Sequence, residues 1–168
     1  PKCKYTKARG DQCDSCGDLL NPTDLIDPKS SLGDSHLELR DSEHYFLNLQ
    51  DLQKFVEEWI STKQDWPKMT LGIAKKWLSE GLKARCITRD LKWGISVPEL
   101  NDKVFYVWFD APNAYISITQ DWALSINKKD EWKRFWHESE DVVYTQFMAK
   151  DNVPFHAIFW PAVLMADG

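Results

Sequence analysis

The stretch Val104-Phe-Tyr-Val-Trp-Phe109 leads directly into Asp110-Ala-Pro-Asn-Ala-Tyr115, and a second apolar run, Val142 to Met148, leads into Ala149-Lys-Asp-Asn-Val-Pro-Phe-His156. Both runs are short and apolar, as expected of strands, and both turns are polar. In open α/β sheets, ligands bind at the edge formed by the carboxyl ends of the strands. We therefore predict an α/β fold with a parallel sheet and a binding site at these two turns.

The composition is that of a folded domain. The chain has 168 residues, 43% of them hydrophobic, and nine tryptophans, which is enough for one domain with a small appendage. Net charge is -5 and the basic residues are dispersed, so no concentrated patch favours nonspecific binding to DNA. No apolar stretch approaches the roughly 20 residues that span a bilayer. We predict a cytoplasmic protein without a membrane partner.

Further elements follow from the spacing of apolar residues. His36 to Leu47 alternates unevenly and predicts a strand or hairpin arm, and short strands are also expected at Arg85 to Thr88. Two helices are indicated by apolar residues at helical spacing, the second ending at Gly81; these residues are Leu49, Leu52, Phe55, Val56, Trp59 and Ile60, then Ile73, Ala74, Trp77 and Leu78. Because strands alternate with helical segments only after this point, we place a domain boundary near residue 83.

Three cysteines, Cys3, Cys13 and Cys16, lie in the first 16 residues, and the last two form a CxxC motif. Zinc prefers four tetrahedral thiolate or imidazole ligands, and a CxxC turn brings two sulfurs to one ion. The spacing favours a structural Zn²⁺ site with one ligand outside this chain, because His36 is too distant along the sequence to suit. A redox pair or unconnected thiols are the alternatives.

The last helix is predicted to begin near Asn152, with Pro154 in its first turn and Pro161 kinking it further on. A spacing of four places Asn152, His156 and Trp160 on one face, although His156 and Trp160 could equally be a core pair. Trp108 and Tyr115 can reach the same edge. An aromatic pocket with few polar groups suits a small apolar ligand, including a thioether.

Lys150 and Asp151 place a cation and a carboxylate beside the amino terminus of this helix. Such a position suits the phosphate and ribose of a nucleotide. Simple solvation at the surface is the alternative.

Four strings together resemble methionyl-tRNA synthetase: Ala8-Arg-Gly-Asp-Gln-Cys13, Ile87-Thr-Arg-Asp90, Val104-Phe-Tyr-Val-Trp-Phe-Asp-Ala-Pro112 and Lys150-Asp-Asn-Val-Pro-Phe-His156. They occur in the family's order and cover nearly the whole chain. The resemblance implies a class I synthetase with a Rossmann-type core, in which residues 1–83 form a connective insertion with a zinc knuckle at 1–26. Residues 84–168 would belong to the second half of the catalytic core.

The resemblance also implies a reaction and roles for individual residues. The family joins methionine to ATP, which is accompanied by Mg²⁺, and transfers the methionyl group to tRNA(Met). Arg89 would assist activation, although a surface salt bridge with Asp90 is the alternative. The residues implied for the methionine pocket are Trp108, Ala111, Pro112, Tyr115, Asn152, His156 and Trp160, and those facing the adenylate are Ala149, Lys150 and Asp151.

The sequence departs from the family at several points. Ala149 stands where the family usually has glycine, and its Cβ could crowd the nucleotide if the backbone approaches closely. Asn113-Ala114 replaces the usual Ile-Gly and adds a side chain at a tight turn. The HIGH-like and KMSKS-like ATP motifs are absent, and the chain begins at Pro1 without methionine, so we interpret it as a fragment that is inactive alone. A noncatalytic zinc module that binds RNA or protein is the main alternative, and a synthetase for a branched apolar amino acid is another.

Overall fold

The computed structural model describes residues 3–10, 13–16, 18, 20–31, 33, 36–137 and 140–167. The chain divides into two compact units, Pro1–Glu43 and His44–Gly168. The three clustered cysteines lie in the first unit, whereas both helices expected before residue 83 lie in the second. The assignment of residues 1–83 to a connective insertion concerns function and stays a prediction.

Among its described residues, the first unit contains one short 3-10 helix, η1 (Pro22–Asp24). The Asp24 carboxylate accepts a hydrogen bond from the backbone N–H of Asn21 at 2.8 Å and so caps this turn. Gly10 is required by a close backbone approach, because a Cβ there would lie 2.8 Å from the Cα of Pro22. The strand expected over His36–Leu47 was too long: only Phe46–Leu47, in the second unit, forms strand β1.

The helices α1 (Leu49–Ser61) and α2 (Lys68–Ser79) match the predicted apolar spacing. Leu49, Val56 and Ile60 of α1 are buried, although Phe55 is exposed. The chain leaves α2 through Gly81 at φ +78°, a conformation that glycine adopts without strain. The Gln53 side chain joins the two helices, since its amide donates to the Leu78 carbonyl at 3.3 Å and its oxygen accepts from the Leu82 N–H at 2.8 Å.

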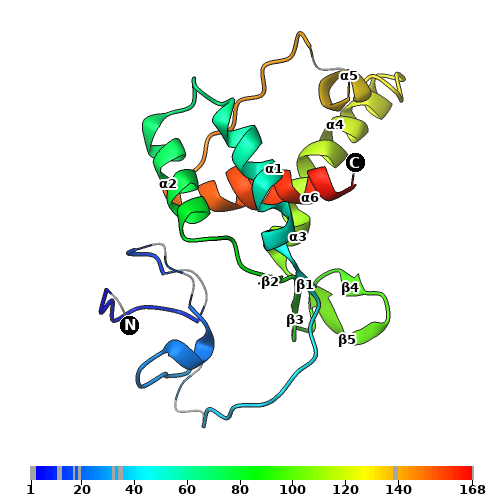
Figure 1. Ribbon diagram of the computed structural model, residues 1–168. Coiled ribbons are helices and arrows are strands. Elements are labelled where there is room, and N and C mark those ends of the chain that lie inside the picture. The colour runs from blue at the N-terminus through cyan, green and yellow to red at the C-terminus, as the bar shows by residue number, and fades with distance from the viewer. Residues whose placement is uncertain are drawn as a thin grey trace. The chain divides into compact units, whose positions relative to one another are not determined.

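The helical run from Val153 to Asp167 forms the centre of the second unit. It is buried on all sides from Val153 to Ala162, and α1 and α2 pack against it (Figure 1). It comprises a π-helical segment, η4 (Phe155–Phe159), followed by α6 (Trp160–Asp167). The backbone N–H of Trp160 donates to the carbonyl of Phe155, five residues earlier. Pro161 has no N–H to continue the ladder, and a widened turn relieves the clash of its ring with the preceding turn. The predicted distortion at Pro161 is therefore observed.

The expected parallel sheet is wrong for the part of the chain that the structure describes. Strand β1 pairs antiparallel with β2 (Arg85–Cys86). The other sheet has the order β3-β5-β4, formed by Thr88–Arg89, Leu100–Phe105 and Ser96–Val97, and its pairs are also antiparallel. Only Pro98 and Glu99 separate β4 from β5, and Glu99 has φ +70°. A connection this short makes a hairpin, because parallel neighbours need a crossover of a dozen or more residues.

Both apolar runs that suggested strands differ from expectation. The strand in Val104–Phe109 ends at Phe105, and Val107–Asp110 form a helical turn, α3. The run Val142–Met148 has no regular secondary structure and pairs with no strand among the described residues. A short apolar run fits a strand or a buried helical turn equally well, so periodicity alone could not separate the two.

The remaining elements follow α3 directly. The 3-10 turn η2 (Ala111–Asn113) leads into α4 (Ala114–Ser125), and α5 (Lys133–Trp136) packs back against α4. The Trp136 indole N–H donates to the Thr119 hydroxyl at 3.1 Å, and the rings of Trp122 and Phe135 meet edge-on at 5.7 Å. A short 3-10 turn, η3 (Lys150–Asn152), precedes the central helical run. No helix among the described residues is long and apolar enough to cross a bilayer.

Candidate functional site

The side chain of His156 lies at the centre of an aromatic group contributed by α3, α4 and the central helical run. The residue is only 9% exposed. Its Nδ1 lies 2.9 Å from the Asn152 carbonyl oxygen, and its Nε2 lies 3.0 Å from the Tyr115 hydroxyl. Because a carbonyl oxygen only accepts, Nδ1 carries a proton; in the neutral form of this tautomer, Nε2 is the acceptor for the Tyr115 hydroxyl. Asn152 thus contributes its backbone and fixes the tautomer of His156.

Trp108 lies against the same helical turn. Its ring stacks on Phe155 with centroids 4.9 Å apart and planes inclined by 17°, and it meets the His156 ring edge-on at 6.0 Å. Phe155 is buried and Trp108 is half-buried. The position of Trp108 is therefore set by a buried ring, while part of its surface is accessible to a ligand.

Trp160 forms the next part of the aromatic group. Its indole N–H donates to Asn113 Oδ1 at 3.2 Å, and its ring lies 5.5 Å from Tyr115 and 5.9 Å from Trp136. The structure therefore brings Trp108, Tyr115, His156 and Trp160 together, as the sequence predicted. Ala111 and Pro112 form the η2 turn that leads into the helix of Tyr115.

An open groove of about 520 Å³ lies beside this group. Trp136 joins the two, because it contacts Trp160 on one side and Tyr144 at 5.3 Å on the other. The groove is lined mainly by apolar side chains from α4, α5 and the irregular segment 142–148; these are Ile118, Thr119, Trp122, Phe135, Trp136, Val142, Val143 and Tyr144.

The three residues expected to face an adenylate lie at the start of the central helical run. Ala149, Lys150 and Asp151 are all exposed, and Asn152 N–H donates to the Ala149 carbonyl to close the η3 turn. No side-chain hydrogen bond caps η3 at Ala149 or η4 at Pro154. Because Lys150 and Asp151 are exposed, their charged side chains are accessible to a nucleotide from solvent.

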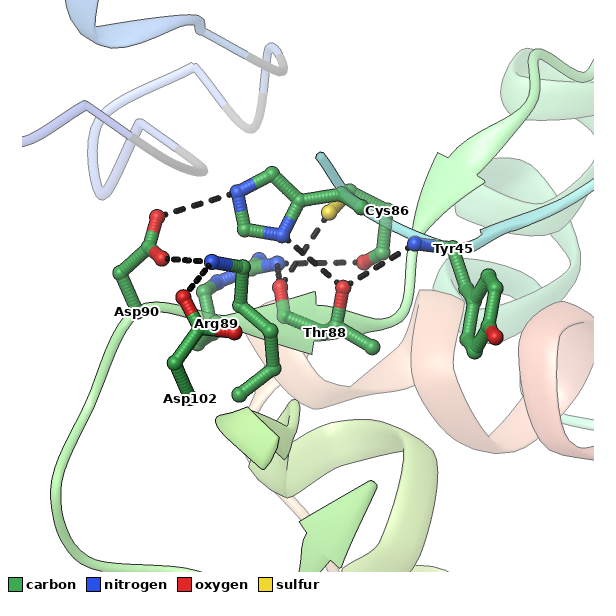
Figure 2. Close-up of polar contacts among 8 residues, drawn as sticks. Tyr45, Cys86, Thr88, Arg89, Asp90 and Asp102 are labelled. Carbon is green, nitrogen blue, oxygen red and sulfur yellow. Dashed lines mark hydrogen bonds and ion pairs between the residues drawn. The ribbon is translucent and has the colours of Figure 1, made fainter. Parts of the chain in front are cut away.

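Arg89 projects from β3 over the ring of Tyr106. Its guanidinium carbon lies 3.9 Å from the ring centroid, and its Nη1 donates to the carbonyls of Cys86 and Thr88 at 3.2 and 2.8 Å (Figure 2). Among the described residues Arg89 has no carboxylate partner, so the alternative of a salt bridge with Asp90 is not observed. Asp90 instead pairs with His44 and Lys103.

The three cysteines of the first unit converge. Their sulfur atoms all lie within 4.8 Å of one another, and those of Cys3 and Cys13 are 3.6 Å apart. Thiolates at about 2.3 Å from a tetrahedral zinc are separated by about 3.8 Å, so the spacing fits such an ion. The backbone N–H groups of Cys16 and Ser15 lower the pKa of the Cys13 thiol, which favours the thiolate that metals bind.

Several residues of this site were not predicted. Phe155 supports Trp108, Asn113 accepts from Trp160, and Trp136 links the aromatic group to the groove. Asn113 stood out in the sequence only as a departure from the family. Trp136 gave no signal, because it reaches the group from a separate helix more than 20 residues before Trp160.

Comparisons with known proteins agree on one family. The model for the family described as tRNA synthetases class I (M) matches residues 1–168. Methionine-tRNA ligase 1 of Acaryochloris marina is 54% identical over 170 residues, covering 99% of this chain and 30% of that protein. A methionine-tRNA ligase of Cereibacter sphaeroides is 52% identical over 181 residues, covering 99% of this chain and 32% of that protein.

Solved structures point the same way. The Mycobacterium tuberculosis methionyl-tRNA synthetase in complex with methionyl-adenylate aligns with a TM-score of 0.61 and 28% identity, covering 73% of this chain and 23% of that one. Its apo form aligns with a TM-score of 0.59. The chain thus spans about 30% of the length of the curated relatives it matches. Since the family model matches every residue, this chain belongs to the class I tRNA synthetases of the methionyl family.

Proposed function

We propose that this chain is part of a methionine-tRNA ligase, in which it supplies the methionine pocket and part of the nucleotide site. The observation that carries the proposal is the convergence of Trp108, Tyr115, His156 and Trp160 on one aromatic group. Sulfur makes favourable contacts with aromatic rings, and the hydroxyl of Tyr115 and the imidazole of His156 add polar groups to this surface. The names of the relatives agree with a thioether amino acid as the ligand.

Within the whole enzyme, residues 84–168 would contribute to the catalytic core and residues 1–83 to a connective insertion. The two compact units divide earlier, at Glu43 and His44, because α1 and α2 pack on the central helical run. We infer that the insertion would carry its zinc knuckle on the first unit and dock its helices on the core.

Activation of methionine requires no covalent bond to the protein. The methionine carboxylate attacks the α-phosphate of ATP in line and displaces pyrophosphate, so the protein orients both substrates and stabilises the developing charge. Trp108, Tyr115 and His156 would orient the side chain of methionine. Lys150 and Asp151 would face the adenylate, and Arg89, which has no carboxylate partner among the described residues, would stabilise negative charge.

Two metal ions accompany this proposal. Cys3, Cys13 and Cys16 would hold a Zn²⁺ ion together with a fourth ligand, and a closed sulfur shell would give it a structural role. Mg²⁺ would enter with ATP. The partners of the whole enzyme would be methionine, ATP and tRNA(Met).

Exchange of pyrophosphate into ATP by the full-length enzyme tests the proposal. We expect exchange that depends on methionine and is far weaker with leucine or valine, because pocket shape must reject smaller side chains when each methylene contributes only about 1–3 kcal/mol. Equal rates with leucine would indicate a different synthetase. No exchange with any amino acid would indicate a noncatalytic module that binds RNA or protein through its zinc unit.

A further inference from the structure

The imidazole of His44 bridges the two residues that flank Arg89. Its Nδ1 lies 2.9 Å from the Thr88 hydroxyl, and its Nε2 lies 3.2 Å from the Asp90 carboxylate. Since a carboxylate only accepts, Nε2 carries a proton; in the neutral form of this tautomer, Nδ1 is the acceptor for the hydroxyl of Thr88. Thr88 is fully buried and also accepts the Tyr45 N–H at 3.1 Å. These contacts are drawn in Figure 2.

Arg89 lies on the other side of the same strand. Successive side chains of a strand point to opposite faces, so Thr88 faces His44 while Arg89 points away from it, over Tyr106. Asp90 lies just beyond β3, and its contact with His44 places its carboxylate on the His44 side. The carbonyls of Cys86 and Thr88 hold its guanidinium. The segment that carries these carbonyls is held by the Thr88 hydroxyl, which contacts His44 and the Tyr45 N–H, and by the backbone hydrogen bond from the Ile87 N–H to the Tyr45 carbonyl at 2.9 Å.

The charge of Asp90 is directed away from Arg89. Lys103, whose side chain is 7% exposed, lies 2.6 Å from Asp90 and 2.7 Å from Asp102. The hydrogen bonds to Asp102 and Asp90 raise the pKa of Lys103. The carboxylate of Asp90 contacts Lys103 and His44 on the face of the strand opposite Arg89. Because Asp90 does not pair with Arg89, the positive charge of the guanidinium can act on a ligand.

We propose that His44 is a positioning residue for Arg89, which it holds in place by bridging Thr88 and Asp90 from the opposite face of the strand. The inference rests on the proposed function, because it assigns Arg89 to the activation of methionine. His44 does not touch the aromatic group around His156. Its loss should therefore alter the rate of activation without altering the binding of methionine.

The test is methionine-dependent pyrophosphate exchange by the full-length enzyme. We expect His44→Ala to lower kcat about tenfold, within the usual range of coupling between residues of one network, and to leave the KM for methionine within about twofold. His44→Gln keeps an amide donor and acceptor and should recover part of the rate. His137→Ala removes an exposed histidine outside this network and is the matched control.

A double-mutant cycle separates positioning from general destabilisation. If His44 acts through Arg89, adding His44→Ala to Arg89→Gln lowers kcat no further than Arg89→Gln alone. The inference is overturned, with the proposed function intact, by any of three results. The double variant could show the product of the two single losses in kcat, His44→Ala could leave kcat unchanged, or it could raise KM with kcat unchanged. If His44→Ala does not fold, the same cycle with His44→Gln shows whether His44 acts through Arg89. A wild-type enzyme without methionine-dependent exchange would instead refute the proposed function and the inference with it.

Discussion

Replacing Tyr115 by phenylalanine removes the hydroxyl that donates to His156 and leaves the ring in place. The acceptor that remains, His156 Nε2, belongs to a residue only 9% exposed. A buried acceptor without its partner costs about 1–3 kcal/mol. Tyr115 itself is 37% exposed, so water can reach this side, and we expect the lower end of that range, ~1 kcal/mol. This is about a fivefold shift of the folding equilibrium.

Tyr144→Phe is the matched control for this experiment. Tyr144 is also about half exposed and packs against Trp136, but its hydroxyl bonds to no other described residue. Urea unfolding of the full-length protein, followed by tryptophan fluorescence, should show a lower midpoint for Tyr115→Phe and little change for Tyr144→Phe. Equal effects of the two changes would refute the role given to the hydrogen bond between Tyr115 and His156.

Three other changes test separate parts of the structure. Trp160→Phe should lower the free energy of unfolding by about 1–3 kcal/mol, because Asn113 Oδ1 loses its donor; thermal denaturation measures this. Cys16→Ser should reduce the bound zinc measured by atomic emission from about one equivalent to well below one. The hydrogen bond from Lys103 lowers the pKa of Asp102 below 3.8, so its stabilisation is present above about pH 4 and is lost in acid. Asp102→Asn should therefore flatten the acid limb of the pH–stability curve.

Periodic apolar positions gave the helices correctly. Helix α1 was predicted because apolar residues such as Val56 and Ile60 recur on one of its faces, and α2 because Ala74 and Leu78 do the same on one of its own. The face of a helix that packs on the core repeats at every turn. Gly81 marked the end of α2 because its positive φ is a local requirement. Features governed by spacing within one segment were therefore accessible from the sequence.

The sheet could not be predicted in the same way. Strand direction depends on which segments pair, and an apolar run such as Val142–Met148 carries no information about its partner. Val143 and Phe147 of this run are 91% and 97% exposed, whereas Met148 packs against the core of the second unit, so the run is not buried as a sheet strand would be. The tight Pro98-Glu99 turn was the one local signal of an antiparallel pair.

The candidate site shows the same division. His156 and Trp160 were placed together from spacing alone, whereas the approach of Trp136 and Asn113 from other elements depended on tertiary packing. At both departures from the family the backbone conformation is unstrained. Ala149 has φ -75° and ψ 159°, an extended conformation open to any residue, so its Cβ causes no backbone strain. Asn113 uses its added side chain to accept from Trp160. A side chain that looked like crowding in the sequence thus holds one wall of the aromatic group in place.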